Sequence, residues 1–426
     1  MEIFNQELDL FLRPKLQNEI DKVFDREFSP ISSIQHGSPI EFMIPGSHNL
    51  YLDLAKSYLY IKCKISTPTN DNPANDIQVG IINLPLHSLF SKVDIELGGK
   101  LISDSNGLYG YRAYIETLLN SGLDSAVSQL QLELFEKDTA NHLNDFAIAD
   151  DAANKGLNNR ARYFRGGPEV ELLGRIHGDI FNQQHAILSN VNLKIKLYPS
   201  ANNFILTTPA PQNNAAQVNY KINILDARML IHTIHASESV IREHDKLLQN
   251  HFAFYPLLNV TMKIISVPRG QTSTMQDNIY LGNLPAKIAL AMVTDESMVR
   301  GYQQNPFNFH HFNLNYLALY ANGELIPNRP YQPNFEQNFY IKDYQSLFDG
   351  KWGSSCIIDR YDYAHGYTMW LFNLVPYPRS ESKTGSVRLE LKFAQALGHT
   401  INIILFAEFD SHLQIDKYRN VTFVNG

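Results

Sequence analysis

The sequence predicts an all-β protein of two tandem eight-stranded antiparallel jelly rolls, a double jelly roll with short helical insertions. Three observations support this prediction: one block of motifs occurs twice in the same order, the length suits two domains, and many short strand-like segments alternate with turn signals. An open sheet leaves its edges unpaired, whereas two sheets closed over each other protect them. Among antiparallel folds, this favours the jelly roll.

The repeated block consists of four short motifs. The first copy holds Asn49–Leu52, Gly99–Ile102, Val191–Leu197 and Ile222–Leu225, and the second holds Asn278–Leu281, Gly323–Ile326, Val387–Phe393 and Ile401–Ile404. One four-residue match is common by chance, but four matches in one order indicate that a single β domain was duplicated. Every interval between motifs is longer in the first copy. Loop insertions explain this, because surface loops accept extra residues at small entropic cost.

The composition indicates a folded chain whose surface is partly covered. A length of 426 residues fits two domains of roughly 200 residues each. Hydrophobic residues make up 44%, while charged residues make up 19%, below the usual roughly 25% of soluble domains. We therefore expect other copies of the chain to cover part of the surface. The net charge is −7 and no long Lys/Arg run occurs, so no specific nucleic-acid binding is predicted.

Cysteines and termini predict a protein that is not secreted. Cys63 and Cys356 are too few for a disulfide framework or a CxxC metal motif, and Cys63 lies in an alternating strand-like segment as a small core residue. The N-terminus has no signal-peptide pattern, and no apolar run reaches the roughly 18 residues of a membrane span. We expect a reducing compartment. Whether an internal membrane accompanies the protein stays open.

The predicted organisation has three parts. Residues 1–38 form a leader or arm, residues 39–236 the first jelly roll with long helical and loop insertions, and residues 237–426 the second, which opens with a connector over 237–258. Apolar residues spaced by four predict a helix within the leader, starting near Pro14. They are Leu8, Leu12, Leu16 and Ile20.

Alternating apolar residues and turn signals place the elements of the first part. Strands are predicted at 40–44, 58–65, 93–97, 170–176, 191–197 and 220–232, and helices at 107–120 and 124–137. The segments 139–168 and 199–217 are rich in Gly, Asn or Pro. We expect both to run over the surface as loops.

The second part repeats this plan with shorter loops. A helical connector is predicted over 238–250 and a helical island over 335–348, with strands at 260–267, 316–321, 369–374, 387–393 and 401–409. The turn at Asn322-Gly323 corresponds to the turn at Gly98-Gly99 in the first part.

Several stretches carry a family likeness. They are Glu7–Phe11, Pro30–Ile34, Pro39–Phe42, Leu86–Asp94, Tyr111–Leu119, Asn305–His311 and Tyr320–Glu324. In these stretches, which span nearly the whole chain, the sequence resembles the hexon-like double jelly-roll major capsid proteins of Polinton (Maverick) elements and adintoviruses. The segment Arg13–Arg26 departs from the leader that this likeness leads us to expect, so its role stays open.

The resemblance implies a structural protein of a virion capsid. It implies a homotrimer whose pseudo-hexagonal capsomers contact neighbouring capsomers and a single jelly-roll penton protein, in the icosahedral shell of a double-stranded DNA virus or virus-like transposon. It also implies synthesis in the host cytoplasm and assembly in the nucleus. Duplication suits this role, because three two-domain chains present six similar edges while the two halves can diverge. The host, the lattice size and the receptor-contacting loops stay open, as does whether particles are still produced.

No catalytic, cofactor or metal site can be assembled from the sequence, so we expect no enzyme. His87 and His311, the latter beside His310, precede equivalent predicted strands. A zinc site would need further ligands, and none is evident, so packing or hydrogen-bonding roles are favoured. His232 and His235 lie in a strand-like run that places them on opposite faces, which argues against a ligand pair.

Other candidate residues also have an ordinary structural interpretation. The acidic loops could bind a cation, but solvated loop charge is favoured because no EF-hand spacing is present. Their residues are Asp145, Asp150 and Asp151 in one loop and Asp359 and Asp362 in another. Ser354 and Ser355 lack the second glycine of a nucleophile elbow. Gly166–Pro168 is predicted as a turn, and the aromatic stretch Tyr361–Trp370 as a core or subunit-interface strand instead of a base-stacking surface.

The alternative function is a jelly-roll binding module or a cupin-like metal enzyme. A cupin site needs clustered histidines and a glutamate on adjacent strands, and the sequence does not supply that set. Oligomeric state and metal content distinguish the two: a trimer supports the capsid interpretation, and a monomer with stoichiometric iron or zinc supports the enzyme.

Overall fold

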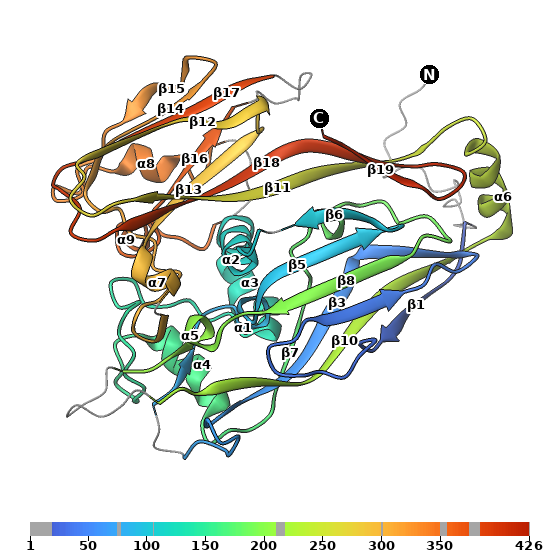
Figure 1. Cartoon of the computed structure of the whole chain (residues 1–426), viewed down its shortest axis with the longest axis horizontal. Coiled ribbons are helices and arrows are strands. Elements are labelled where there is room, and N and C mark those ends of the chain that lie inside the picture. Colours follow the sequence, from blue (N-terminus) through green and yellow to red (C-terminus); the bar gives the residue numbers. More distant parts are fainter. Residues whose placement is uncertain are drawn as a thin grey trace, which may run out of the picture.

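Two β-sandwiches lie side by side in the computed structural model (Figure 1). It describes residues 19–74, 78–104, 106–209, 218–299, 301–349, 356–374 and 384–425. The expected leader helix lies largely outside these residues, because Leu8, Leu12 and Leu16 are not among them. Within the described part, no helix is long and apolar enough to cross a membrane.

The first sandwich consists of two four-stranded antiparallel sheets. One sheet has the order β1-β10-β3-β7, formed by Ile20–Phe28, Lys221–Ala236, Leu50–Ser66 and Val170–Gly174. The other has the order β2-β8-β5-β6, formed by Ile40–Ile44, Leu193–Pro199, Phe90–Leu97 and Lys100–Asp104. A short pair, β4 (Gly80–Ile81) with β9 (Leu206–Thr207), forms a separate small sheet.

The second sandwich has the same construction. One sheet has the order β11-β18-β13-β16, formed by Ala253–Val267, Ile401–Ile415, Lys287–Thr294 and Met369–Asn373, and β19 (Val421–Asn425) pairs with β18. The other has the order β12-β17-β14-β15, formed by Ser273–Asn283, Thr384–Phe393, Leu314–Ala321 and Glu324–Tyr331.

The two halves share one strand order. When the eight principal strands of each half are numbered in chain order, both halves show the sheets 1-8-3-6 and 2-7-4-5. This order places strands from the two ends of each half next to each other, which is the jelly-roll arrangement. The predicted fold of two eight-stranded jelly rolls is therefore confirmed.

Three of the four motif pairs occupy equivalent places. Gly99 and Gly323 both follow the fourth strand with positive φ (80° and 83°), where a tight hairpin needs a residue without Cβ. The third motifs lie in the seventh strands and the fourth motifs in the eighth. The first pair was wrong: Asn49 precedes the third strand of its half, whereas Asn278 lies in the second strand of its half. That match arose by chance.

Part of the expected leader is a strand. β1 covers Ile20–Phe28 and pairs with β10 from Ile20↔Ala236 to Phe28↔Met229. It therefore gives the previously unexplained segment Arg13–Arg26 a partial role, as an edge strand whose backbone groups are satisfied by β10. Ile20, expected in a helix, belongs to this strand. The domain boundaries themselves stay a prediction.

Helices lie mainly in the connections between strands. They are α1 (Pro85–Ser88), α2 (Tyr109–Asn120), α3 (Leu123–Ala126), α4 (Lys155–Phe164), α5 (Asn202–Ile205), α6 (Glu238–Leu247), α7 (Asp295–Val299), α8 (Ile341–Gln345) and α9 (Arg360–Ala364), with 3-10 turns η2 (Gln129–Glu133), η3 (Asp179–Phe181) and η4 (Gly301–Gln303). The expectation of a surface loop over 139–168 was wrong in part, because α4 buries Leu157, Arg160 and Phe164. The polar composition of this segment did not indicate a buried helix, because Arg160 is buried in an ion pair with Asp138.

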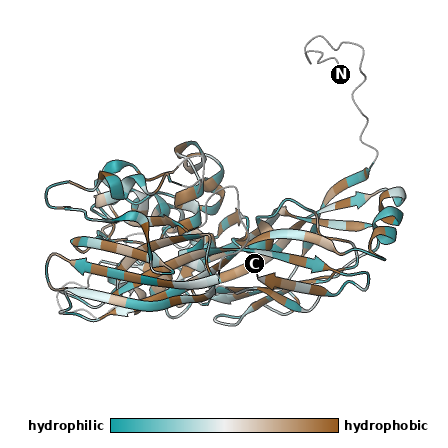
Figure 2. Ribbon diagram, turned by 90° about the horizontal axis from the view of Figure 1, so that it is seen from above, coloured by the Kyte–Doolittle hydropathy of each residue, from teal (hydrophilic) through white to brown (hydrophobic). Residues whose placement is uncertain are grey.

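Three apolar cores hold these elements together. Two lie between the paired sheets of the first and second rolls, and the third lies between α2 and the β11-β18-β13-β16 sheet. β13 contributes to two of them: Ala289 and Ala291 face α2, while Ile288 and Leu290 face the interior of the second roll. Figure 2 shows hydrophobic residues along the strands of both rolls.

Candidate functional site

Aromatic side chains join the two rolls where α2 contacts the second one (Figure 1). Tyr114 of α2 stacks on Phe307, which lies between β13 and β14, with ring centroids 4.1 Å apart and planes inclined by 13°. Tyr111 contacts the same ring edge-on at 5.6 Å. Such pairs contribute about 0.5–1.5 kcal/mol beyond their buried area. An insertion of the first half thus forms part of the core of the second.

A buried ion-pair chain reinforces this contact. Arg112 of α2 donates to Glu116 at 2.9 Å and to Asp179 of η3 at 2.6 Å, and all three side chains are nearly inaccessible. Asp179 also accepts the backbone N–H of Val260 in β11 at 3.3 Å. Burial alone would raise the pKa of Glu116, but Arg112 and His177 lower it to about 2. The network therefore fixes α2 and η3 against a strand of the second roll.

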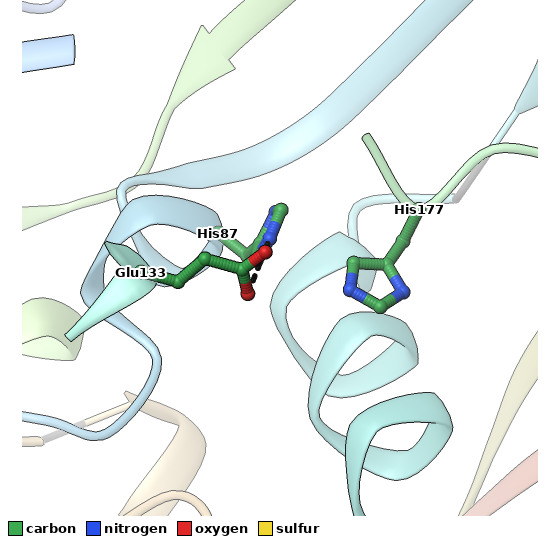
Figure 3. A group of neighbouring side chains, drawn as sticks. All are labelled: His87, Glu133 and His177. Atoms are coloured by element: carbon green, nitrogen blue, oxygen red, sulfur yellow. Dashed lines mark ion pairs between the residues drawn. The ribbon is translucent and has the colours of Figure 1, made fainter. Parts of the chain in front are cut away.

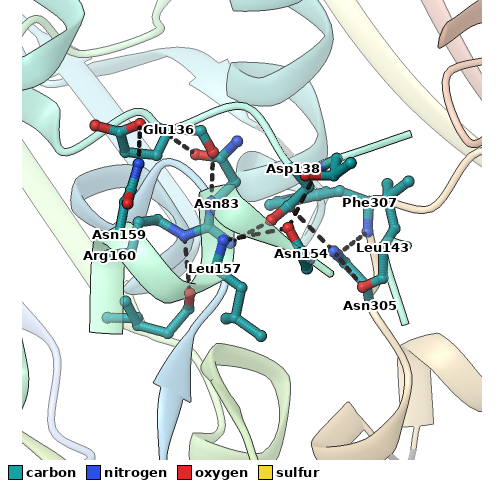
Figure 4. A network of polar contacts seen from close by, with 12 residues as sticks. Asn83, Glu136, Asp138, Leu143, Asn154, Leu157, Asn159, Arg160, Asn305 and Phe307 are labelled. Atoms are coloured by element: carbon teal, nitrogen blue, oxygen red, sulfur yellow. Dashed lines mark hydrogen bonds and ion pairs between the residues drawn. The ribbon is translucent and has the colours of Figure 1, made fainter. Parts of the chain in front are cut away.

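A second buried network connects α4 and β4 with the loops that carry Asp138 and Asn305 (Figure 4). Arg160 of α4 donates to the Ile81 carbonyl at 2.9 Å and to Asp138 at 2.7 Å. The other oxygen of Asp138 accepts from Asn305 of the second roll at 3.2 Å. The charges are paired and each oxygen of the Asp138 carboxylate accepts a hydrogen bond, as is typical of a structural network.

Two histidines and a glutamate converge in the first roll (Figure 3). His87 of α1, Glu133 of η2 and His177, which follows β7, each offer a ligand atom, and these atoms lie within 4.8 Å of one another. Burial lowers the pKa of His87, whereas the pKa of Glu133 falls below its ordinary value because His87 and His177 outweigh its burial. His87 was a candidate from the sequence, but Glu133 and His177 were not. No spacing signal could have found them, because each belongs to a different loop.

His310 and His311 lie elsewhere, in the second roll. His311 stacks on Phe335 with centroids 3.9 Å apart, and its Nδ1 accepts the Asn313 backbone N–H at 3.0 Å. Burial lowers the pKa of His311 to about 4. His87 and His311 do precede equivalent strands, β5 and β14, but the structure does not bring them together. The packing role predicted for His311 matches these contacts.

The remaining charged candidates have local partners. His232 and His235 lie next to Asp25 and Asp21 of β1 at 2.7 and 3.3 Å, so each histidine has its own carboxylate. Asp359 and Asp362 form the capping box of α9. Asp362 also pairs with Lys137, and in the other acidic loop Asp145 contacts His142 at 2.5 Å while Asp150 contacts Arg162 at 3.5 Å.

The other candidates are structural or lie outside the described residues. Ser354 and Ser355 are not among the described residues. Gly166 and Gly167 both have positive φ, as expected for the turn before Pro168. In the aromatic stretch Tyr361–Trp370, the side chains of Tyr363, Tyr367 and Trp370 are fully buried. The predicted core position is therefore correct for these three residues, but the predicted strand was wrong for the first part of the stretch, where Arg360–Ala364 form α9 and the strand β16 begins only at Met369.

Large apolar side chains are exposed on two loop regions. In α3 and the segment after it, Leu123 and Val127 are 65% and 80% exposed. Between β15 and β16, Phe339 is 68% exposed and Phe348 and Tyr361 are more than half exposed. Exposed apolar side chains are candidates for contact surfaces, and others, such as Leu281 and Tyr418, lie elsewhere on the chain. We take these two loop regions as candidate assembly surfaces.

Comparison with known proteins finds solved structures of similar fold but no matching family model. No family model matches the chain. The uncharacterized protein F54H12.2 of Caenorhabditis elegans is 23% identical over 410 residues, covering 91% of this chain and 94% of the relative. Among solved structures, a chain of the Sputnik virophage matches with a TM-score of 0.69 and 12% identity, covering 100% of this chain and 93% of that one.

Two further structures are major capsid proteins. That of Faustovirus matches with a TM-score of 0.57 and 9% identity, covering 98% of this chain and 92% of that one. That of mavirus matches with a TM-score of 0.54 and 9% identity, covering 99% of this chain and 93% of that one. At these identities the likeness shows the fold, a double jelly roll spanning the whole chain.

Proposed function

We propose that this chain is a major capsid protein that assembles into homotrimeric, pseudo-hexagonal capsomers of an icosahedral shell. The observation that carries the proposal is the identical strand order of the two rolls, held together through α2. Three such chains would arrange six similar rolls around a threefold axis, which suits near-sixfold lateral contacts. The fold shared with viral capsid proteins supports this role.

The exposed loop residues supply the contacts that a trimer needs. A threefold ring uses a head-to-tail interface, in which two different patches of each chain meet. The exposed apolar residues of α3 and of the β15–β16 loop are two such patches, and they lie on different halves of the chain. Their burial between sister chains would account for the low content of charged residues.

The finer assignment follows the family resemblance. We infer a Polinton-like or adintovirus-like element, a virion location with nuclear assembly after cytoplasmic synthesis, and a single jelly-roll penton protein as partner. With a net charge of −7, the chain would rely on other proteins for genome packaging. The cupin-like alternative has weaker support, because His87, Glu133 and His177 come from loops and 3-10 or short helical turns instead of adjacent strands.

Solution mass and electron microscopy test the proposal. We expect the purified chain to have about three times its mass of 48.6 kDa and to form threefold particles with a pseudo-hexagonal outline. The double variant Phe339→Asp/Phe348→Asp should shift the protein to monomers, because it places charges in the proposed interface. Tyr418→Asp, which changes an even more exposed aromatic residue in the β18–β19 turn, should leave the trimer intact. A monomeric wild-type chain that forms no particles would refute the proposal.

A further inference from the structure

A nitrogen and a carboxylate oxygen face each other in the first roll without a hydrogen bond. His87 Nε2 and Glu133 Oε2 are 3.3 Å apart. Both atoms are buried; they form a charged contact with each other whose geometry is not that of a hydrogen bond, and neither makes a hydrogen bond to another described group. The His87 side chain is fully inaccessible. A buried polar atom without a hydrogen bond is destabilising, so two such atoms that face each other at this distance point to a ligand between them.

We propose that His87, Glu133 and His177 bind one Zn²⁺ ion, which joins three loops of the first roll. The geometry supports this ion. Zinc bonds of about 2.0–2.1 Å at tetrahedral angles place two ligand atoms about 3.3–3.4 Å apart. The separation of His87 Nε2 and Glu133 Oε2 equals that edge. The three ligand atoms lie within 4.8 Å of one another, so the His177 ring would move toward a bound ion to complete the tetrahedral arrangement. Water would take the fourth position, since the His177 side chain is 19% exposed.

The surroundings orient both imidazole rings for this role. His177 Nδ1 lies 2.6 Å from Glu116 Oε2, which leaves Nε2 as the ring nitrogen free to bind a metal. Glu116 is itself held by Arg112 at 2.9 Å. On the other ring, His87 Nδ1 lies 2.9 Å from the Tyr109 hydroxyl. A carboxylate or hydroxyl on the second ring nitrogen is the usual support of a zinc-bound histidine.

Gly174 leaves space for the Glu133 carboxylate. The Glu133 side chain lies directly over Gly174 in β7, where a Cβ would collide with the Glu133 carboxylate. Glycine at this point therefore makes room for the carboxylate beside the two rings. The nitrogen and oxygen donors favour Zn²⁺ over Mg²⁺ or Ca²⁺, which prefer sites made of oxygen ligands alone.

The ion would act as a structural link. Its ligands belong to α1, η2 and the segment between β7 and η3, which are far apart in sequence. Glu116 and Asp179 connect the same region to the second roll through Arg112. Zinc would therefore stabilise the end of the first roll that contacts the second. This inference is independent of the proposed capsid function.

Metal analysis of the full-length protein tests the site. The chain is freed of metal with a chelator, dialysed against Zn²⁺ and analysed by mass spectrometry for zinc per chain. We expect about one ion per chain and a competition-measured affinity that falls at least tenfold in His177→Gln and in Glu133→Gln. Glu116→Gln should weaken binding by about 10–100-fold, as is usual for a residue that supports a ligand. Bound Co²⁺ should show the intense visible absorption of a tetrahedral ion.

A matched control comes from the duplication itself. His311 precedes the equivalent strand of the second roll and is partly buried, but it stacks on Phe335 and lacks this carboxylate partner. His311→Gln should therefore bind zinc like the wild type. If the wild-type chain retains no zinc after dialysis, His87 and Glu133 form an ordinary ion pair and the proposal is wrong. Equal affinity in His177→Gln and the wild type would also overturn it.

Discussion

Replacing Arg112 with methionine should strongly destabilise the protein, because the guanidinium is the only cation that the described residues place within ion-pair distance of Asp179. Methionine keeps a long apolar side chain but removes the charge. Glu116 would keep His177 as a neighbour, and Asp179 would keep the Val260 N–H. Both carboxylates would otherwise be buried without their main partner.

The structure indicates the size of this effect. The Glu116 pKa lies at about 2 instead of 4.5, and a shift of this size corresponds to about 3 kcal/mol at neutral pH. Because the folded-state pKa is depressed, this stabilisation is present above the unfolded value and is lost as the pH falls toward about 2. Breaking a buried ion pair by removing one partner typically costs about 3–5 kcal/mol. We expect a loss in that range at pH 7 for Arg112→Met.

Urea unfolding followed by circular dichroism at pH 7 measures this loss. Arg162→Met is the matched control, because Arg162 pairs with Asp150 on the surface, where its side chain is 54% exposed. An exposed pair contributes about 0–1 kcal/mol, so this variant should unfold almost like the wild type. A loss below about 1 kcal/mol in Arg112→Met would show that the buried chain contributes little net stability. The account of the junction between the rolls would then be wrong.

Three further substitutions test other parts of the structure. Asp343→Asn should stabilise the protein above pH 7 by up to about 4 kcal/mol and have little effect below pH 4. Burial raises the Asp343 pKa from 3.8 to about 7, so the free energy of unfolding of the wild type falls as the pH rises between these values. Asparagine carries no charge and can still accept the Trp370 N–H. Thermal unfolding from pH 4 to 8 checks this, and a variant less stable than the wild type at pH 8 would contradict it. Phe307→Ala should cost about 3–5 kcal/mol in urea unfolding, because a fully buried ring of the junction is lost; a loss under about 1 kcal/mol would argue against that contact. Gly366→Ala should lower the free energy of unfolding by about 1–3 kcal/mol, because the residue has φ +112° and a Cβ would collide with Leu143. An unchanged free energy of unfolding would show that the loop adapts.

Local patterns in the sequence were sufficient to predict much of the fold. The alternation in Tyr58–Ile65 placed a half-buried strand, and that segment lies within β3 with Leu59, Ile61, Cys63 and Ile65 fully buried. The glycine turn before Ile102 also lies where expected. A pattern of period two is local, so neighbouring residues alone reveal it.

Features that depend on distant partners could not be predicted. α4 was missed because Arg160 looks like a surface residue until Asp138 and two carbonyl groups are placed around it. β1 was missed because most of its side chains are exposed and only pairing with β10 identifies it as a strand. The cluster around His87 likewise needs three loops to meet. In each case, the deciding contact is made by residues far away in the chain.

The duplicated halves have diverged in a way that the contacts explain. In the first roll, the outer face of the β1-β10-β3-β7 sheet carries paired charges, such as Lys62 with Glu169 and Arg228 with Glu27. In the second roll, the corresponding face is apolar and is covered by α2, which belongs to the first half. The longer first copy therefore supplies the cover that the second copy needs. The second half contributes to the first roll through other elements, because Tyr255, Leu257, Leu413 and Ile415 of β11 and β18 pack in the core of that roll. The two rolls therefore cannot be interchanged, and a trimer of this chain would have alternating edges instead of six identical ones.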